Sequence, residues 1–400
     1  MSNLPQIDFG SLAGKRVLVR ADLNVPMQGV EITDTTRIDR FLPTVKALSE
    51  AGAIVVILTH LGRPDGAVNP ALSTAPIAAA MGSMLGRDVR FVTECVGEMA
   101  QQAVGDLRKG DVAVLENIRF HKGETDNDAE FAEQLAELGD IYMNDAFSCS
   151  HRAHASTHAI AKILPSYAGP SLLAEVNALS DALETPQRPV AALVGGAKVS
   201  TKITVLVNLI PKVNYLIIGG GMANTFLAAK GYPMGKSLYE PDSIDTANEV
   251  MAMAEKQACE LVLPVDLVVS KEFAANAENH VVAADKNPDD AMALDVGPES
   301  QAKVIEVLHK CKTLLWNGPM GAFEIEPFGE ATFAVAKSAA ELTDAGKLIT
   351  VAGGGDTVAA LNAAGATERF TYVSTAGGAF LEWLEGKELP GIAVLSPKNT

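Results

Sequence analysis

The stretch that decides the fold is VAALVGGAKVSTK, residues 190–202. Its first five residues, Val190–Val194, are an apolar run with the length and composition of a buried strand, and two glycines follow directly. Lys198 and Lys202 then open a segment of helical character, four residues apart and therefore on one helix face. A strand, a tight glycine turn and a helix in this order are typical of a parallel α/β unit.

The same alternation of short apolar runs and helix-period segments extends through the whole chain. Further strands are predicted at Val17–Asp22, Ile54–Thr59, Val89–Val92, Val112–Glu116, Ile141–Asn144, Tyr215–Ile218, Leu261–Val269, Thr313–Trp316, Leu348–Ala352 and Thr371–Ser374. Helices are expected between them, in the first half near residues 35–51, 75–85, 96–107 and 128–138. This alternation indicates parallel sheets covered by helices on both faces, and eleven strands suit two sheets better than one.

Proline and glycine residues near the middle of the chain mark a domain boundary. Pro165 and the pair Gly169-Pro170 precede a helical segment, Ser171–Glu184, and two more prolines follow it. We therefore predict an α/β fold of two doubly wound, Rossmann-like parallel-sheet domains joined by this helix and a hinge. Ligands of open parallel sheets bind beyond the carboxyl ends of the strands, so we expect a ligand cleft between the domains.

Composition excludes several classes of protein. Of the 400 residues 48% are apolar and 20% charged, which argues against intrinsic disorder. A net charge of −17 argues against a nucleic-acid binder. The apolar runs are too short to span a membrane, and the N-terminus does not resemble a secretory signal. The four cysteines lie far apart, so we expect a reduced, cytoplasmic protein, and no pattern requires more than a monomer.

Cationic and polar side chains follow the predicted strands of the first half. Ten of the 12 arginines lie in residues 1–170. Parallel strands end at one edge of a sheet, and the residues expected there are Asp22, Asn24, Arg37, His60, Arg63, Arg119 and Arg152. Four arginines together would hold a small, multiply anionic ligand, with Asp22 and Asn24 on its hydroxyl group. The alternative is that each arginine pairs with a nearby carboxylate.

Glycine-rich loops follow the strands of the second half. They are Gly195-Gly196, Gly219-Gly220-Gly221, Asn317-Gly318, Gly353-Gly354-Gly355 and Gly377-Gly378. Glycine lets backbone amides approach a phosphate closely, so five such loops at one edge indicate a nucleotide site. Lys198 and Lys202 would face the phosphates, and Asp356 could bind Mg²⁺ directly or through water. For any single loop, close strand–helix packing is an equally good interpretation.

Three sequence patterns are similar to a zinc-binding motif, a P-loop and a dinucleotide-binding fingerprint, but none matches its motif fully. His151, His154 and His158 have a spacing unlike the zinc-binding H-E-x-x-H motif. The segment Gly231–Ser237 is similar to a P-loop, but it has one residue too few between its glycines and follows a predicted helix. The glycine loops near 219 and 353 each lack the third glycine of the dinucleotide-binding fingerprint, so a nicotinamide enzyme is an unsupported alternative.

Nine motifs that occur in a fixed order carry a family resemblance. They are RADLNVP (20–26), HLGRP (60–64), ENIRF (116–120), HRAH (151–154), GAKVSTK (196–202), the triple glycine before Met222, WNGP (316–319), GGGDT (353–357) and STAGGA (374–379). With them the chain resembles phosphoglycerate kinases over essentially its whole length. The resemblance implies reversible phosphoryl transfer from 1,3-bisphosphoglycerate to MgADP, giving 3-phosphoglycerate and MgATP in glycolysis or gluconeogenesis, with hinge-bending closure and in-line transfer.

The resemblance also implies roles for individual residues. The triose would be bound by Asp22, Leu23, Asn24, Arg37, His60, Leu61, Gly62, Arg63, Arg119 and Arg152. The nucleotide would be bound by Lys198, Lys202, Gly219, Asn317, Glu324, Gly353, Gly354, Gly355, Asp356 and Thr357, with Glu324 on the ribose. The group in transfer would be surrounded by Arg37 and Lys198 and by amides at Gly354 and Gly377. Mg²⁺, bound with ADP or ATP, would have Asp356 as its ligand.

The same resemblance gives the expected domains. Residues 1–170 would form the 3-phosphoglycerate-binding domain, 171–185 the interdomain helix and 186–389 the nucleotide-binding domain. The C-terminal tail, from about residue 390 to 400, is expected to fold back on the first domain. The partners would be small-molecule substrates only, without nucleic acid or membrane.

Two positions depart from the family pattern. Ala376 stands where the family usually has glycine, and Ser148 stands where a glycine is common before HRAH. The methyl group of Ala376 matters only if that residue needs a positive φ angle. Two hypotheses compete with a kinase. One is a nicotinamide dehydrogenase, which NAD(H) binding would reveal, and the other is a non-catalytic phosphoglycerate or nucleotide sensor, which turnover would exclude.

Overall fold

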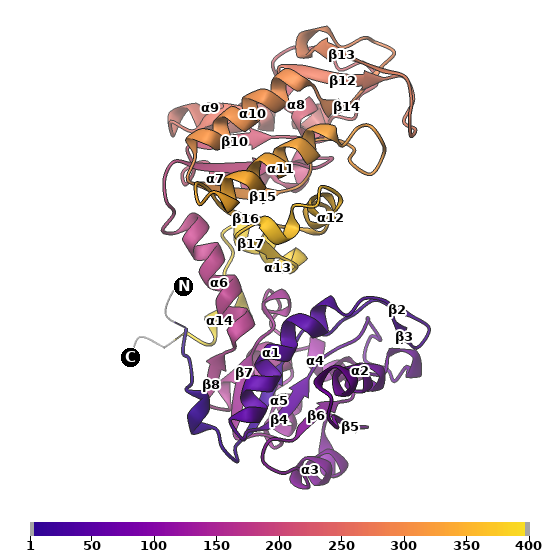
Figure 1. Ribbon diagram of the computed structural model, residues 1–400, viewed down its shortest axis with the longest axis vertical. Coiled ribbons are helices and arrows are strands. Elements are labelled where there is room, and N and C mark those ends of the chain that lie inside the picture. Colours follow the sequence, from indigo (N-terminus) through magenta and orange to yellow (C-terminus); the bar gives the residue numbers. More distant parts are fainter. Residues whose placement is uncertain (1–3, 397–400) are drawn as a thin grey trace. The chain divides into compact units, whose positions relative to one another are not determined.

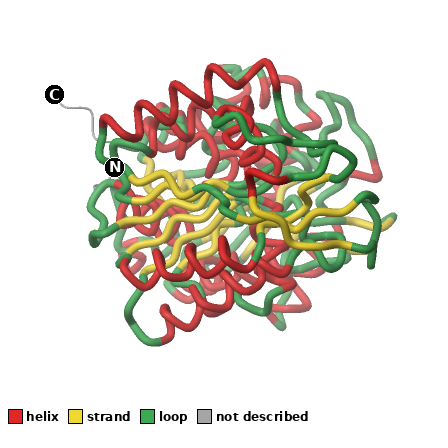
Figure 2. Tube along the Cα trace, turned by 90° about the horizontal axis from the view of Figure 1, so that it is seen from above, coloured by secondary structure: helices red, strands yellow, loops and turns green. Residues whose placement is uncertain are grey.

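The computed structural model describes residues 4–396. These residues divide into two compact units (Figure 1): the first comprises the chain up to Asn177 together with the segment from Glu388 onward, and the second runs from Ala178 to Lys387. Each unit has its own six-stranded sheet, and Figure 2 shows helices on both sides of the strands. The predicted fold class, α/β with two doubly wound parallel sheets, is confirmed. The described residues contain no helix with the length and apolarity needed to cross a membrane.

Six parallel strands form the sheet of the first unit, in the order β5-β6-β4-β1-β7-β8. They are β1 (Arg16–Arg20), β4 (Ile54–Leu58), β5 (Arg90–Val92), β6 (Val112–Leu115), β7 (Ile141–Asn144) and β8 (Ser166–Ala168). The last four residues of both β1 and β4 are buried, because helices cover the two faces of the sheet. The three-residue strand β8 has too short an apolar run to be predicted.

The helices of the first unit begin and end close to the predicted ranges. They are α1 (Thr36–Glu50), α2 (Ala75–Leu85), α3 (Gly97–Gly105) and α5 (Ala129–Ala136), with the short α4 (Lys122–Thr125) and α14 (Pro390–Ala393) and the hairpin β2 (Met27–Gln28) and β3 (Glu31–Ile32). Helix α6 (Pro170–Leu183) begins in the first unit and continues into the second after Asn177. In α1 the buried Ile38, Phe41, Val45 and Leu48 recur every three or four residues, so one face packs on the sheet.

The sheet of the second unit has the strand order β11-β10-β9-β15-β16-β17, and all its neighbouring pairs are parallel. Its strands are β9 (Val190–Val194), β10 (Tyr215–Ile218), β11 (Glu260–Val262), β15 (Thr313–Asn317), β16 (Ile349–Gly353) and β17 (Tyr372–Ser374). Its helices are α7 (Ile203–Leu209), α8 (Gly221–Ala229), α9 (Ile244–Lys256), α10 (Pro298–Lys310), α11 (Glu330–Asp344), α12 (Gly355–Ala363) and α13 (Gly377–Leu384). Counted along the chain this is the order 3-2-1-4-5-6 of dinucleotide-binding folds, which reverses between β9 and β15.

One predicted strand is wrong. The range Leu261–Val269 contains two strands, β11 and β12 (Asp266–Ser270), which belong to different sheets. Pro264 lies between them, and proline cannot donate to a strand ladder. Strand β12 is the centre of an antiparallel sheet with β13 (Asn279–Ala283) and β14 (Met292–Val296), which the sequence analysis missed.

The end of the chain returns to the first unit. Gly391 in α14 donates its N–H to the carbonyl oxygen of Ser150 at 2.9 Å, and Asn144 donates its side-chain amide to the carbonyl oxygen of Gly391 at 2.9 Å. Of the predicted tail, residues 397–400 lie outside the described residues. The segment between α14 and residue 396 belongs to the same compact unit.

Candidate active site

Strand register aligns the carboxyl ends of three strands in the first unit, because Arg20 lies opposite both Leu58 and Asn144. The loops after β1, β4 and β7 therefore begin side by side. These loops carry Asp22, Leu23, Asn24, His60, Leu61, Gly62, Arg63 and Arg152, while Arg119 follows β6 and Arg37 lies in the first turn of α1. The structure thus gathers the residues predicted for the triose at one edge of one sheet.

Asp22 is the meeting point of three segments at this edge. The guanidinium of Arg37 donates to its Oδ2, and so does the hydroxyl group of Ser148, which lies in the 3₁₀ turn Phe147–Cys149. The N–H of Asn24 is 3.3 Å from Oδ1 of Asp22. Burial lowers the pKa of Arg37, but a guanidinium remains charged at neutral pH. Ser148, one of the two departures from the family pattern, therefore helps to fix Asp22.

A second set of hydrogen bonds joins the loops after β1, β4 and β6. The N–H of Gly62 donates to Oδ1 of Asn24 at 2.8 Å, and Arg119 donates from Nη1 to the carbonyl oxygen of Gly62 at 3.0 Å. Asn117 donates from Nδ2 to the carbonyl oxygen of Leu61 at 2.7 Å. These bonds fix the backbone of residues 60–63 to the loops after β1 and β6, so this edge of the sheet is preorganised without a ligand.

The cations at the edge repel one another. Burial lowers the pKa of Arg119, and the nearby charges of Arg20 and Arg63 lower it further. His60 is buried, and Arg63 and Arg152 are exposed. A multiply anionic ligand would relieve this repulsion, because opposite charges favour the protonated form of each group.

Two of the three histidines of the rejected zinc pattern, His154 and His158, contact different side chains. Nδ1 of His154 lies 3.7 Å from Oε1 of Glu124, and Nδ1 of His158 lies 3.1 Å from the side-chain nitrogen of Asn127. Burial is the main cause that lowers the pKa of His154 to about 4, and the charges of Arg119 and Arg20 contribute.

In the second unit four glycine loops line one cavity of about 410 Å³. Its walls come from the loops after β9, β15, β16 and β17 and include Lys198, Lys202, Asn317, Gly354, Gly355, Asp356, Thr357 and Gly377. The loops are interlocked: Asn317 donates from Nδ2 to the carbonyl oxygen of Gly353 at 2.8 Å, and the N–H of Gly318 donates to Oγ1 of Thr357 at 2.7 Å. The cavity lies beside β9 and β15, where the strand order reverses and where such folds bind nucleotides.

The two lysines line this cavity, but the backbone that carries them differs from the predicted helix. Residues Val199–Thr201 form a 3₁₀ turn and α7 begins only at Ile203, so Lys198 and Lys202 do not share an α-helical face. Both still line the cavity. Lys202 donates to Oδ1 of Asn317, and burial lowers its pKa against the opposing effect of Asp356.

A larger and mostly apolar cavity of about 670 Å³ shares the loops after β9, β15 and β16, and Gly220 and Gly221, which follow β10, also line it. Glu324 and Asp356 line it, together with apolar residues that the sequence analysis missed: Leu238, Tyr239, Phe273, Met292, Leu294 and Met320. These residues come from separate loops and, for Met292 and Leu294, from strand β14, and no motif joins them that could have indicated them. The P-loop-like segment also contributes here, because Lys236 and Ser237 line this cavity while Ser237 accepts a hydrogen bond from the N–H of Ala293 at 2.9 Å.

Two predicted nucleotide residues, Gly219 and Gly353, are buried beneath the loops and lie outside the lining of both cavities. A Cβ atom on Gly219 would lie 2.9 Å from Cα of Met320. A Cβ on Gly353 would lie 2.8 Å from the ring of Phe380. Close packing explains both glycines. Ala376 has a φ of −86°, so its methyl group causes no backbone strain, and the following Gly377 has the positive φ of 37°.

Comparison with known proteins agrees with this geometry. The family model described as phosphoglycerate kinase matches residues 7–387. The chain belongs to the phosphoglycerate kinase family. It is 57% identical over 392 residues to the phosphoglycerate kinase of Methylobacterium radiotolerans, which covers 98% of each chain. It is 58% identical over 395 residues to that of Azorhizobium caulinodans, which covers 99% of this chain and all of the relative.

Solved phosphoglycerate kinases share the fold. The structure from Coxiella burnetii matches with a TM-score of 0.90 at 44% sequence identity, and that from Pyrococcus horikoshii with a TM-score of 0.80 at 30%, each covering 96% of both chains. The predicted activity is confirmed: the protein is a phosphotransferase with a carboxyl group as acceptor, acting on ADP and ATP in the phosphoglycerate kinase reaction. The dehydrogenase hypothesis is set aside.

Proposed function

We propose that the arginine-rich edge of the first unit binds 3-phosphoglycerate and 1,3-bisphosphoglycerate, and that the two cavities of the second unit bind ADP and ATP. The observation that carries the proposal is the difference between the two sites. Forked cationic side chains converge at the first, while main-chain amides of glycine loops line the second. Guanidinium groups suit a compact anion with carboxylate and phosphate ends, and amides at strand ends suit a chain of phosphates.

The arginines proposed to bind the triose fall into two groups that differ in burial. Arg37 and Arg119 are half-buried and held by hydrogen bonds, so they define fixed positions for the anion. Arg63 and Arg152 are exposed and can adapt to the ligand as it enters. Asp22 and Asn24 supply acceptor oxygens suited to the triose hydroxyl group.

The nucleotide is proposed to occupy both cavities of the second unit. Its phosphates lie in the smaller one, against Lys198, Lys202 and the amides after Gly354. The base and ribose lie in the larger, apolar one, where Glu324 accepts from the ribose hydroxyl groups. Asp356 lines both cavities, which fits a residue at the junction of ribose and phosphates.

Asp356 is also the proposed ligand for the Mg²⁺ ion that accompanies the nucleotide. Its carboxylate is exposed, lies in the first turn of α12 and borders both cavities. One carboxylate with water and phosphate oxygens is the donor set that Mg²⁺ prefers, so the residue fits the ion. When bound, the ion neutralises charge on the phosphates.

The proposed chemistry is positioning and charge neutralisation. The accepting oxygen already belongs to a phosphate of ADP, so the transfer requires no general base. Arg37 and Lys198 flank the oxygens of the group in transfer, and amides at Gly354 and Gly377 donate to the same oxygens. Because different units bind the reactants, we also propose hinge closure, through the segments predicted near residues 165–190 and at Ser374-Thr375.

Each binding site is built by one chain, so we propose a monomer. All four cysteines are free and buried, which supports a reducing, cytoplasmic environment.

Calorimetric titration of paired variants tests the division between the units. Arg119→Met is expected to weaken 3-phosphoglycerate binding at least tenfold and leave nucleotide binding unchanged, because it removes a fixed cation from the first unit. Lys202→Met should do the reverse. Arg16→Met is the matched control, since Arg16 begins β1 at the opposite end from the site. Loss of both ligands from either variant would refute the proposal.

Catalysis is tested separately with Lys198→Ala. We expect kcat to fall about 100-fold while the dissociation constant for 3-phosphoglycerate stays nearly constant, because Lys198 acts on the group in transfer. The measurement is a coupled assay of ATP formation with calorimetry of the same sample. An equal loss of triose affinity would contradict the assigned role.

A further inference from the structure

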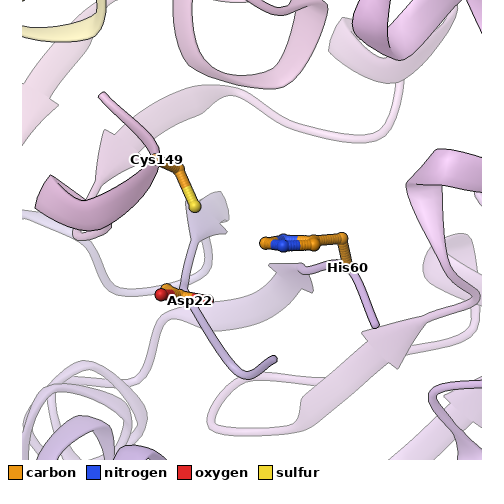
Figure 3. Close-up of side chains that lie close together, drawn as sticks. All are labelled: Asp22, His60 and Cys149. Carbon is orange, nitrogen blue, oxygen red and sulfur yellow. The ribbon is translucent and has the colours of Figure 1, made fainter. Parts of the chain in front are cut away.

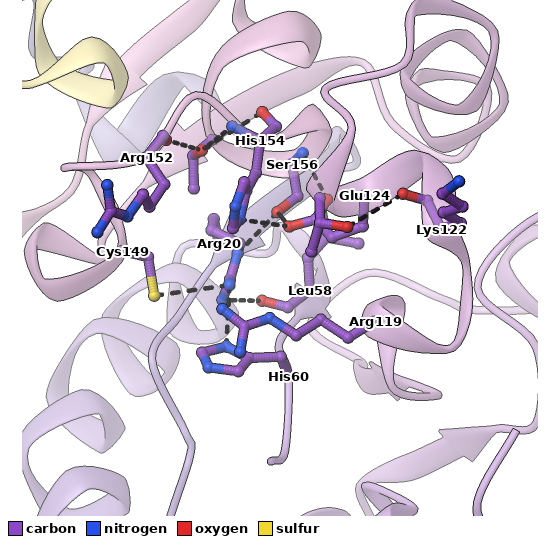
Figure 4. Close-up of polar contacts among 12 residues, drawn as sticks. Arg20, Leu58, His60, Arg119, Lys122, Glu124, Cys149, Arg152, His154 and Ser156 are labelled. Carbon is purple, nitrogen blue, oxygen red and sulfur yellow. Dashed lines mark hydrogen bonds and ion pairs between the residues drawn. The ribbon is translucent and has the colours of Figure 1, made fainter. Parts of the chain in front are cut away.

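A buried polar cluster lies under the arginine-rich edge of the first unit (Figure 4). Its centre is Arg20, the last residue of β1, which is 0% exposed. Nε of Arg20 donates to Oγ of Ser156 at 2.8 Å. Ser156 in turn donates to the two carboxylate oxygens of buried Glu124, at 2.7 Å from Oγ and 2.9 Å from its N–H. A buried guanidinium is thus linked to a buried carboxylate, as buried charges require.

The other end of Arg20 faces His60. Nη2 lies 3.1 Å from Nδ1 of His60 and 3.6 Å from Sγ of Cys149, and Nη1 donates to the carbonyl oxygens of Ala21 and Leu58. A guanidinium has donors only, so Nδ1 of His60 has to accept this hydrogen bond. A neutral imidazole that accepts through Nδ1 carries its proton on Nε2.

Asp22, His60 and Cys149 resemble a metal site, because their ligand atoms lie within 4.8 Å of one another (Figure 3). Two contacts argue against a metal ion there. Arg20 already places its guanidinium against His60 and Cys149, and Arg37 is paired with Asp22. A divalent cation would meet two fixed positive charges at short range. The cluster is therefore a cation-lined edge rather than a cation site.

The surroundings also keep His60 neutral. Burial lowers its pKa well below 6.5, and the charges of neighbouring groups lower it further. The titratable or charged groups around it are Arg20 in β1, Asp22 after β1, Arg37 in α1, Arg119 after β6, Cys149 in the turn after β7, and His154. Asp22, the carboxylate among them, is already engaged by Arg37 and Ser148.

We propose that Arg20 is a positioning residue of the kinase: by occupying Nδ1 of His60, it fixes the imidazole as the Nε2–H tautomer, so that His60 meets the triose as a neutral hydrogen-bond donor. The inference rests on the proposed binding of the triose by His60. An anionic ligand needs donors, and a neutral imidazole of the other tautomer would present a lone pair to it instead. Arg20 thus acts on the ligand without touching it.

Nitrogen-15 NMR of the full-length protein with labelled histidine tests the tautomer directly. The His60 signals, assigned with His60→Gln, are expected to show a protonated Nε2 and an unprotonated Nδ1 at pH 6.5, without ligand. A protonated Nδ1, or an imidazolium at that pH, would overturn the proposal. The tautomer is measured on the unaltered protein, with the variant used only to assign the signals, and the result does not depend on where the triose binds.

Variants then test whether the tautomer matters for the reaction. Arg20→Lys keeps the charge beside Glu124 but cannot span from Ser156 to His60. We expect a three- to tenfold rise in KM for the triose, about the value of one hydrogen bond, with KM for the nucleotide unchanged. Tyr142→Phe is the matched control, because it removes a buried 2.7 Å hydrogen bond to the carbonyl of Ser156 without touching Arg20 or His60. Equal triose KM values in Arg20→Lys and Tyr142→Phe would overturn the role of Arg20.

Substitutions of His60 separate this proposal from the proposed function. The side-chain amide of His60→Gln puts a donor near the position of Nε2, whereas that of His60→Asn reaches only the position of Nδ1. His60→Gln should therefore bind the triose better than His60→Asn by at least threefold. If both variants bound it as well as the unaltered protein, the triose role of His60 would be refuted, whatever the NMR shows of Arg20.

Discussion

Both units have a binding site at the carboxyl-terminal edge of a parallel sheet, but the first site is built mainly from side chains and the second mainly from main-chain groups. In the first unit long charged side chains reach the edge. Arg37 is held by Asp22 and Arg119 by the carbonyl oxygen of Gly62, while Arg63 and Arg152 are exposed. In the second unit the edge is mostly main chain, and Asn317 and Thr357 serve to hold the loops together. A side-chain site is therefore damaged by truncation, whereas a main-chain site is damaged by adding atoms.

The largest effect is expected from truncating Arg37. Arg37→Met removes one of the two cations that flank the transferred group in the proposed mechanism, so kcat/KM should fall about 1,000-fold. The measurement is the coupled assay of ATP formation. Lys46→Met, an exposed position on the same helix, is the control and should stay within twofold. A loss below tenfold for Arg37→Met would mean that side chains do not dominate the first site.

Adding a single methyl group should damage the second site. Gly354 has a φ of 101°, and a Cβ atom there would lie 2.7 Å from Nδ2 of Asn317. Gly354→Ala is expected to raise KM for ADP about tenfold and to cost about 1–3 kcal/mol of unfolding free energy, without changing triose affinity. Steady-state kinetics and urea denaturation measure the two effects.

The control for that substitution is Gly105→Ala. Gly105 ends α3, and a Cβ on it would meet open space, so stability should change by less than about 1 kcal/mol. An unaltered KM for ADP in Gly354→Ala would show that the loop after β16 tolerates side chains.

Acid should weaken the first unit through His154. Its folded-state pKa is about 4, below the ordinary value of 6.5, so the unfolded chain binds more protons between these pH values. The free energy of unfolding should therefore fall as pH drops through that window, and His154→Gln should lose less stability there. Urea denaturation at pH 7.5 and 4.5 measures the difference, with His309→Gln, on the surface of α10, as control. An identical pH dependence in His154→Gln and the unaltered protein would disprove this source of acid sensitivity.

The smallest effect is expected at Ala376. Its backbone is unstrained, so Ala376→Gly should change kcat/KM by less than twofold and stability by no more than about 0.5 kcal/mol. A rate increase of tenfold would show that the family glycine at this position has a role that φ does not explain.

The sequence revealed the fold because strand–helix alternation is a local pattern, and it revealed the arginine edge because parallel strands end at the same side. Prediction failed for features that depend on contacts between segments far apart in the sequence. The apolar run around Pro264 contains the end of β11 and the start of β12, which belong to different sheets, and nothing in its composition marks the change. The strands of the antiparallel sheet around β12 show no clear alternation of apolar and polar residues. Arg20 was counted in a strand, but its complete burial and its contact with His60 depend on segments 40 residues or more away.

The hydrogen bond between Asn144 and Gly391 joins residues 247 positions apart in the chain. During translation this contact has to wait until the whole second unit has been made. At about 5–20 residues per second the delay is roughly 12–50 seconds. A nascent chain therefore carries a first unit that lacks this contact at the end of β7 while the second unit is made, so the first unit to be synthesised is the last to be completed.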